Sequence, residues 1–136
     1  MTLLIVDDHQ LGAEALATLL RMEGYVVQVA HDGHEALRLL QSGYVPSLIV
    51  LDLVMPVMDG RAFRRAQLAD PMLADIPVYV FSTLAADEVV AELKAAGGRR
   101  KPCPVPLLLA DIAELVGMPG DGAGRSRGGG RQGLSG

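Results

Sequence analysis

The chain has 136 residues, half of them hydrophobic, and a formal net charge of −4. This length fits one domain with a buried core, and the composition excludes a disordered protein. The apolar runs are strand-sized, so we expect no membrane-spanning segment and no membrane partner. The first strand pattern begins directly after Met1-Thr2 without a signal peptide, and Cys103 is the only cysteine. Both features favour the cytoplasm.

Charge is distributed unevenly along the chain. Residues 117–136 contain three arginines and one aspartate, so they carry +2 and residues 1–116 carry −6. An acidic domain is a poor partner for nucleic acid, so we do not expect direct DNA binding. Residues 117–136 are also rich in glycine and contain almost nothing apolar. This composition predicts a domain of residues 1–116 followed by a flexible Gly/Arg-rich tail.

Strand and helix patterns alternate along the chain, which predicts βαβ units and a parallel sheet. Strands are predicted at residues 3–7, 25–30, 48–51 and 78–81. Helices are predicted at residues 10–23, after the turn at 31–33, and at residues 60–68, 87–96 and 105–116. Between Gly97 and Pro102 no residue is apolar, so a fifth strand there would be very short, polar and at the edge of the sheet.

The helix predicted at residues 60–68 follows an acid that can cap it. Asp59 is placed to accept hydrogen bonds from the free backbone N–H groups of its first turn, and a cap is the preferred interpretation of this acid. The same helix carries Arg61, Arg64 and Arg65. We expect these three arginines on its outer, solvent-facing side.

The run of four aliphatic residues at 48–51 leads directly into Asp52. Such a run is typical of a strand that is buried on both faces, because a half-exposed strand alternates apolar and polar residues. Asp52 then lies at the carboxyl edge of the sheet, where open α/β sheets bind their ligands. The first strand ends in the same way, at Asp7 and Asp8. If the two strands are parallel neighbours, three carboxylates meet in one cleft.

Three carboxylates in one cleft repel one another, and a divalent cation relieves that repulsion. Oxygen-only ligands select a hard ion such as Mg²⁺, which leaves room for a phosphate oxygen. A carboxylate at a strand end can also attack phosphorus and form an acyl phosphate. Such a transfer needs a cation and a hydroxyl near the same edge. Lys101 and Ser82 are candidates for these two groups.

In this order along the chain, these motifs resemble those of the receiver domain of two-component response regulators, over about residues 2–116. The motifs are Val6-Asp7-Asp8, Asp52 with Met55-Pro56 and Asp59-Gly60, Ser82-Thr83, and Lys101-Pro102. The resemblance implies a doubly wound, flavodoxin-like α/β fold with a five-stranded parallel sheet in the order 2-1-3-4-5. It also implies a phosphoacceptor signalling domain rather than an enzyme. Because no DNA-binding motif or catalytic output domain follows, we expect a single-domain response regulator that acts by binding a partner or by phosphorelay.

By this resemblance, Asp52 accepts a phosphoryl group from a sensor histidine kinase or a phosphotransfer protein in a Mg²⁺-dependent reaction. Asp8, Asp52 and the carbonyl of Val54 would hold Mg²⁺, with Asp7 acting mainly through water. Ser82 and Lys101 would contact the phosphoryl group, and a cis bond is common in the family before the proline that matches Pro102. The fourth helix, fifth strand and fifth helix would then signal to a downstream protein target, from a monomer or a weak phosphorylation-dependent dimer.

Two positions depart from the family pattern. Gly98 stands where receivers usually have an aromatic switch residue, which predicts that the output face is rebuilt or weakened. Val54 is apolar where many members have a polar side chain that orients water, which predicts a long-lived phosphoryl group.

Alternative interpretations remain. The chain could be a pseudo-receiver that binds proteins without phosphotransfer, or a Mg²⁺-dependent phosphatase with an aspartyl nucleophile. The phosphatase is disfavoured because such enzymes usually place a second acid where this chain has Val54. Buried strands rarely end in three carboxylates without a use, which disfavours a structural role for the acids. Cys103 is interpreted as a small packing residue.

Overall fold

The structure is a computed structural model, and it describes residues 1–119. Five parallel strands form one sheet in the order β2-β1-β3-β4-β5, as predicted. The strands are β1 (Thr2–Val6), β2 (Val26–Ala30), β3 (Leu48–Leu51), β4 (Val78–Ser82) and β5 (Gly97–Arg100). The helices are α1 (Gln10–Met22), α2 (Gly33–Gln41), α3 (Gly60–Ala69), α4 (Asp87–Glu92) and α5 (Val105–Val116). None of these helices is long and apolar enough to cross a membrane.

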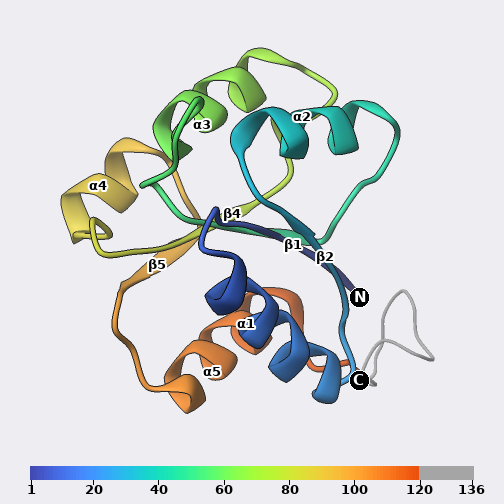
Figure 1. Ribbon diagram of the computed structural model, residues 1–136, viewed down its shortest axis with the longest axis vertical. Coiled ribbons are helices and arrows are strands. Elements are labelled where there is room, and N and C mark those ends of the chain that lie inside the picture. Colours follow the sequence, from blue (N-terminus) through green and yellow to red (C-terminus); the bar gives the residue numbers. More distant parts are fainter. Residues whose placement is uncertain (120–136) are drawn as a thin grey trace.

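Helices cover both faces of the sheet. Helices α1 and α5 lie on one face, and α2, α3 and α4 lie on the other (Figure 1). Each face therefore has its own apolar core: Leu20 and Ile112 belong to the first, and Phe63 and Leu40 to the second. All four residues of β3 are buried, as the unbroken aliphatic run predicted. This double burial keeps β3 in the centre and fixes where Asp52 emerges.

Polar side chains cap the first turns of three helices. Asp59 accepts a hydrogen bond from the N–H of Ala62, so the predicted cap of α3 is confirmed. Asp32 caps α2 in the same way, and Nδ1 of His9 accepts from the N–H of Gly12 at the start of α1. Each cap satisfies a backbone donor that has no partner inside its helix.

The fourth helix is shorter than predicted. It ends at Glu92 rather than near residue 96, because Lys94 adopts a left-handed conformation with φ 54°. The N–H of Lys94 donates to the carbonyl of Ala91, and the N–H of Ala95 donates to that of Val90. This pair of bonds is a Schellman ending, which usually has glycine at the left-handed position. Because this position holds a lysine rather than a glycine, the sequence did not indicate that the helix ends there.

The predicted outward position of Arg64 is wrong. Its side chain is 5 % exposed and lies between α3 and the end of α4. The guanidinium donates to the carbonyls of Leu93 and Lys94, at 3.0 and 2.9 Å, and to Oε1 of Gln67 at 2.8 Å. Helical spacing alone could not show this, because the two carbonyls that Arg64 contacts belong to the residues that directly follow α4, a different element of the fold.

Candidate functional site

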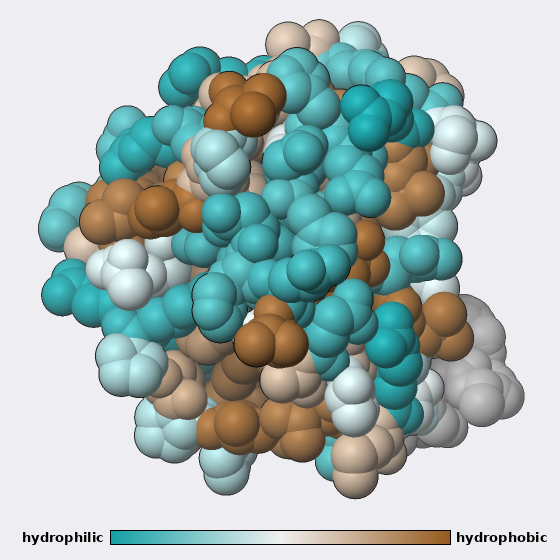
Figure 2. Space-filling view, in the orientation of Figure 1, coloured by the Kyte–Doolittle hydropathy of each residue, from teal (hydrophilic) through white to brown (hydrophobic). Residues whose placement is uncertain are grey.

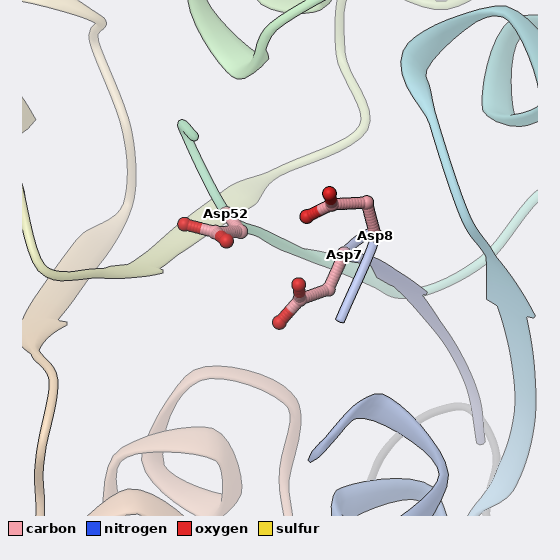
Figure 3. A group of neighbouring side chains, drawn as sticks. All are labelled: Asp7, Asp8 and Asp52. Carbon is pink, nitrogen blue, oxygen red and sulfur yellow. The ribbon is translucent and has the colours of Figure 1, made fainter. Parts of the chain in front are cut away.

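The three predicted carboxylates meet at the carboxyl edge of the sheet. Val6 and Leu51 are partners in the pairing of β1 with β3, so the residues that follow them emerge side by side. The N–H of Asp52 donates to the carbonyl of Val6 at 2.9 Å. One ligand oxygen from each of Asp7, Asp8 and Asp52 lies within 4.8 Å of the others, and the three carboxyl groups turn to the same side (Figure 3). In the same view as Figure 1, hydrophilic side chains cover the centre of the molecular surface (Figure 2).

The three acids differ in exposure. Asp7 is 7 % exposed and Asp52 is 9 % exposed, whereas Asp8 lies at the surface. Oδ1 of Asp7 also accepts a hydrogen bond from the N–H of His9, at 2.9 Å. Two of the three carboxylates are therefore held in a partly dry environment, and the third is open to solvent. Oxygen ligands of this kind fit a hard cation such as Mg²⁺, with water completing its shell.

Lys101 reaches the same cluster from the loop that follows β5. Its ammonium lies 2.8 Å from Oδ2 of Asp7 and 3.8 Å from Oδ2 of Asp52. The backbone N–H of Lys101 donates to the carbonyl of Ser82, and the bond to Pro102 is cis. The ammonium also lies 5.1 Å from the ring centroid of Phe81, at cation–π distance. Lys101 is thus placed between two acids and an aromatic ring.

Ser82 ends β4 beside Asp52 and is fully buried. Its hydroxyl is close enough to the Asp52 carboxylate to lower the pKa of that group, and it accepts a hydrogen bond from the N–H of Leu84, at 3.3 Å. Val54 is 52 % exposed, and its N–H donates to Oδ1 of Asp52 at 3.3 Å. Every residue that was predicted for the site is therefore at this edge of the sheet.

The surroundings of Asp52 act on its pKa in opposite directions. Burial raises the pKa of the Asp52 carboxyl above its ordinary value, and the negative charge of Asp7 adds to that rise. The Ser82 hydroxyl, the Lys101 ammonium and the N–H of Val54 lower it, but burial outweighs them. A cation beside this carboxylate would stabilise its charged form.

A hollow next to the acids was not foreseen from the sequence. It has a volume of about 470 Å³ and an apolar wall formed by Leu16, Phe81 and Cys103, and Lys101 and His9 lie at its polar end. Cys103 is half-buried against the α1/α5 core, in agreement with its predicted packing role. Phe81 carried no sequence signal beyond its place in an apolar strand, because its contact with Lys101 depends on how β4 and the β5–α5 loop meet.

Fold and site together define an α/β protein with an acidic cluster, a lysine and a buried hydroxyl at the carboxyl edge of a parallel sheet. Residues 3–111 match the family described as the response regulator receiver domain. The chain belongs to this family of two-component signalling domains, whose members are signalling modules rather than classical enzymes.

Relatives and solved structures agree with this assignment. The chain is 39% identical over 129 residues to the response regulator MprA of Mycolicibacterium vanbaalenii and 38% identical over 119 residues to MprA of Mycobacterium avium. These matches cover 91% and 85% of this chain but only 54% and 51% of the relatives, so the chain spans about half their length.

Among solved structures, the receiver domain of a histidine kinase from Syntrophus aciditrophicus is 32% identical. Its TM-score is 0.76, over 96% of this chain and 98% of that one. The chemotaxis protein CheY4 of Vibrio cholerae is 28% identical with a TM-score of 0.75, over 84% of this chain and 97% of that one.

Proposed function

We propose that this chain accepts a phosphoryl group on Asp52 in a Mg²⁺-dependent reaction and passes the signal on by binding a protein partner or by phosphorelay. The observation that carries the proposal is the convergence of three carboxylates and Lys101 on one edge of the sheet. Of the three acids, Asp52 is the one with both Ser82 and Lys101 beside its carboxylate. An oxygen of Asp52 can therefore attack phosphorus while a cation and a hydroxyl are already in place.

The roles of the individual residues follow from their positions. Asp8, Asp52 and the carbonyl of Val54 would hold Mg²⁺, with Asp7 acting through water, and the ion would neutralise charge on the transferred group. Lys101 is paired with Asp7 in the free protein, and its ammonium lies 3.8 Å from Oδ2 of Asp52, so it can turn toward a phosphoryl group on that residue. Ser82 can donate its hydroxyl proton to a phosphoryl oxygen at the same edge.

The phosphodonor in this proposal is a sensor histidine kinase or a phosphotransfer protein. The target is a protein rather than DNA, because residues 1–116 carry a net charge of −6, and the free chain is a monomer or a weak phosphorylation-dependent dimer. A cytoplasmic location is also part of the proposal and is supported by the free thiol of Cys103. The receiver domain covers residues 1–116, and most of the predicted tail lies outside the described residues.

A phosphorylation assay tests this function. The full chain is incubated with Mg²⁺ and acetyl phosphate, and its intact mass is followed. We expect the mass of one phosphoryl group to be added and to be absent in Asp52→Asn. The matched control is Asp59→Asn, which changes a nearby exposed acid that only caps α3, and it should still be phosphorylated. No added mass in the unchanged chain would instead favour a pseudo-receiver that binds partners without phosphotransfer.

A further inference from the structure

The two edges of the sheet are finished differently. Strands β2 and β5 are the outermost strands, and in a parallel ladder every second residue turns its N–H and C=O away from the neighbouring strand. At the β2 edge the carbonyl of Val27 accepts a hydrogen bond from Nη2 of Arg21, at 2.8 Å. A side chain of α1 therefore occupies that edge.

The β5 edge has no such cover among residues 1–119. The N–H of Lys101 donates to the carbonyl of Ser82 in β4. With the register of the two strands, this alternation directs the backbone groups of Gly97 and Arg99 toward β4 and turns those of Gly98 and Arg100 outward. No loop, cap or side chain in this part of the chain donates to, or accepts from, the backbone of β5. Unpaired groups in a row are a template for another strand.

An open hollow of about 670 Å³ lies over this edge, between α4 and α5. Its base includes the backbone of Gly97 and Gly98, which present no side chains, and Ala85, Ala86 and Ala96 keep the space beside them open. Glycine in a strand often marks a place where another backbone approaches closely. The volume is within the range of small ligand-binding sites.

The charged residues that line this hollow are unbalanced. They comprise four acids and two arginines: Asp87, Glu88, Asp111, Glu114, Arg99 and Arg100. Arg99 is already held by Asp111, with contacts of 2.6 and 3.2 Å. Within residues 1–119, Asp87, Glu88 and Glu114 form no ion pair inside the hollow. The wall therefore favours a positively charged occupant.

We propose that an extended, basic segment of a protein partner binds here as a sixth strand on β5. Its backbone pairs with the outward groups of Gly98 and Arg100, and its lysines or arginines face the acids of α4 and α5. Because Gly98 has no side chain, this face would recognise its partner through the backbone of β5 rather than through an aromatic switch residue. The inference rests on the proposed function only in taking this segment to be part of the signalling target.

The probe is an acetylated seven-residue peptide of alternating lysine and valine, titrated into the unphosphorylated, ¹⁵N-labelled full chain. We expect saturable shifts at residues 97–100 and slower amide exchange at Gly98 and Arg100. A glutamate–valine peptide of the same length should not bind. A second lysine–valine peptide is N-methylated at every second residue, on the edge that would face β5. It should lose most of its affinity, because it has no N–H groups to donate to the carbonyls of β5. The titration is repeated with Asp52→Asn, which lacks the proposed phosphoacceptor, so that peptide binding is measured independently of phosphorylation.

Reversing two charges tests whether the acidic side chains that line the hollow contribute to binding. Glu88→Lys with Glu114→Lys should weaken binding of the lysine–valine peptide roughly fivefold, because each exposed charge pair contributes only modestly. The control, Glu23→Lys with Asp75→Lys, makes the same change in net charge at exposed sites away from the hollow and should bind as the unchanged chain does.

Four results would overturn the inference. The first is shifts that map outside residues 85–115, and the second is equal binding of the acidic peptide. The third is protection of Gly98 and Arg100 in the free chain with a doubled mass in solution, which would assign the edge to a second copy. The fourth is protection of the same two amides in a monomeric chain, if that protection is lost when Arg125, Arg127 and Arg131 are changed to glutamate. This result would assign the edge of β5 to the chain's own basic end.

Discussion

The guanidinium of Arg64 donates to the main-chain carbonyl of Lys94 across 2.9 Å, and this bond joins α3 to the end of α4. Because Arg64 also donates to the carbonyl of Leu93, a buried cation satisfies the two carbonyls that directly follow the end of this short helix. Burial lowers the pKa of the Arg64 guanidinium, yet its three hydrogen bonds keep the charged group in place.

Arg64→Leu is therefore expected to destabilise the fold by about 3 kcal/mol, because buried carbonyls and Gln67 lose their partner. The free energy of unfolding in urea measures this loss. Arg65→Leu is the matched control, since Arg65 is exposed on the same helix, and it should change stability by less than about 0.5 kcal/mol. Equal effects of the two substitutions would mean that the Arg64 contacts contribute little.

Gly98 has no room for a side chain. A Cβ there would lie 2.7 Å from Cγ2 of Val90 and 2.9 Å from the carbonyl oxygen of Val80. Gly98→Ala should cost about 1–3 kcal/mol by overpacking, and Gly98→Tyr should cost more and displace α4. Gly97→Ala is the control, because its Cβ would meet Tyr79 at an ordinary 3.5 Å. Thermal unfolding distinguishes the two, and a stable Gly98→Tyr would show that α4 can move away at little cost.

Lys101 supplies a positive charge where Mg²⁺ is proposed to bind. A unit charge and a divalent ion about 4 Å apart repel each other by roughly 2 kcal/mol in water, so Lys101→Met should bind Mg²⁺ roughly thirtyfold more tightly at low ionic strength. It should also be phosphorylated more slowly. Arg100→Met removes an exposed neighbouring cation that does not contact the acids and should leave Mg²⁺ affinity unchanged. A Mg²⁺ titration followed by NMR measures both, and weaker binding to Lys101→Met would contradict the electrostatic role.

The raised pKa of Asp52 predicts the sign of a pH effect. The folded protein holds this proton more tightly than the unfolded chain, whose aspartate pKa is about 3.9. Stability is therefore fully present below that value and falls as pH rises through the folded pKa, where the ionised carboxylate must be accommodated. At pH 7, Asp52→Asn should have a higher Tm than the unchanged chain, and the difference should vanish near pH 3.

Magnesium provides a second readout for the same carboxylate. Excess Mg²⁺ should raise the Tm of the unchanged chain and reduce the advantage of Asp52→Asn, because a ligand that binds only the folded state stabilises it. A lower Tm for Asp52→Asn at pH 7 without Mg²⁺ would show that the favourable interactions of the carboxylate with Ser82, Lys101 and Val54 outweigh the cost of its burial.

Val54 sets the expected lifetime of the phosphoryl group. Its exposed apolar side chain stands beside Asp52 and cannot orient an attacking water. Val54→Asn, which adds a hydrogen-bonding amide at the same place, should hydrolyse the acyl phosphate several-fold faster. Val54→Leu is the apolar control. The decay of phosphorylated protein, followed by intact mass after removal of the phosphodonor, compares the three chains, and equal decay rates would exclude a role for this side chain.

The sequence by itself determined the order of elements and the residues at the strand ends. An unbroken aliphatic run specifies a strand buried on both faces, and the carboxyl ends of neighbouring parallel strands always share one edge. Asp7, Asp8, Asp52 and Ser82 were placed correctly for that reason. The weak fifth strand was also visible, because residues 98–101 contain nothing apolar.

Only the tertiary structure decided how separate elements satisfy one another. Lys101 and Asp7 are 94 positions apart, and their ion pair depends on how the β5–α5 loop folds back over β1. Arg64 lies inside rather than outside because it donates to carbonyls that directly follow α4, a different element of the fold. The open edge of β5 likewise exists only because the side chains of α4 and α5 leave it uncovered, whereas Arg21 covers β2. Local patterns describe one element at a time, and these features belong to pairs of elements.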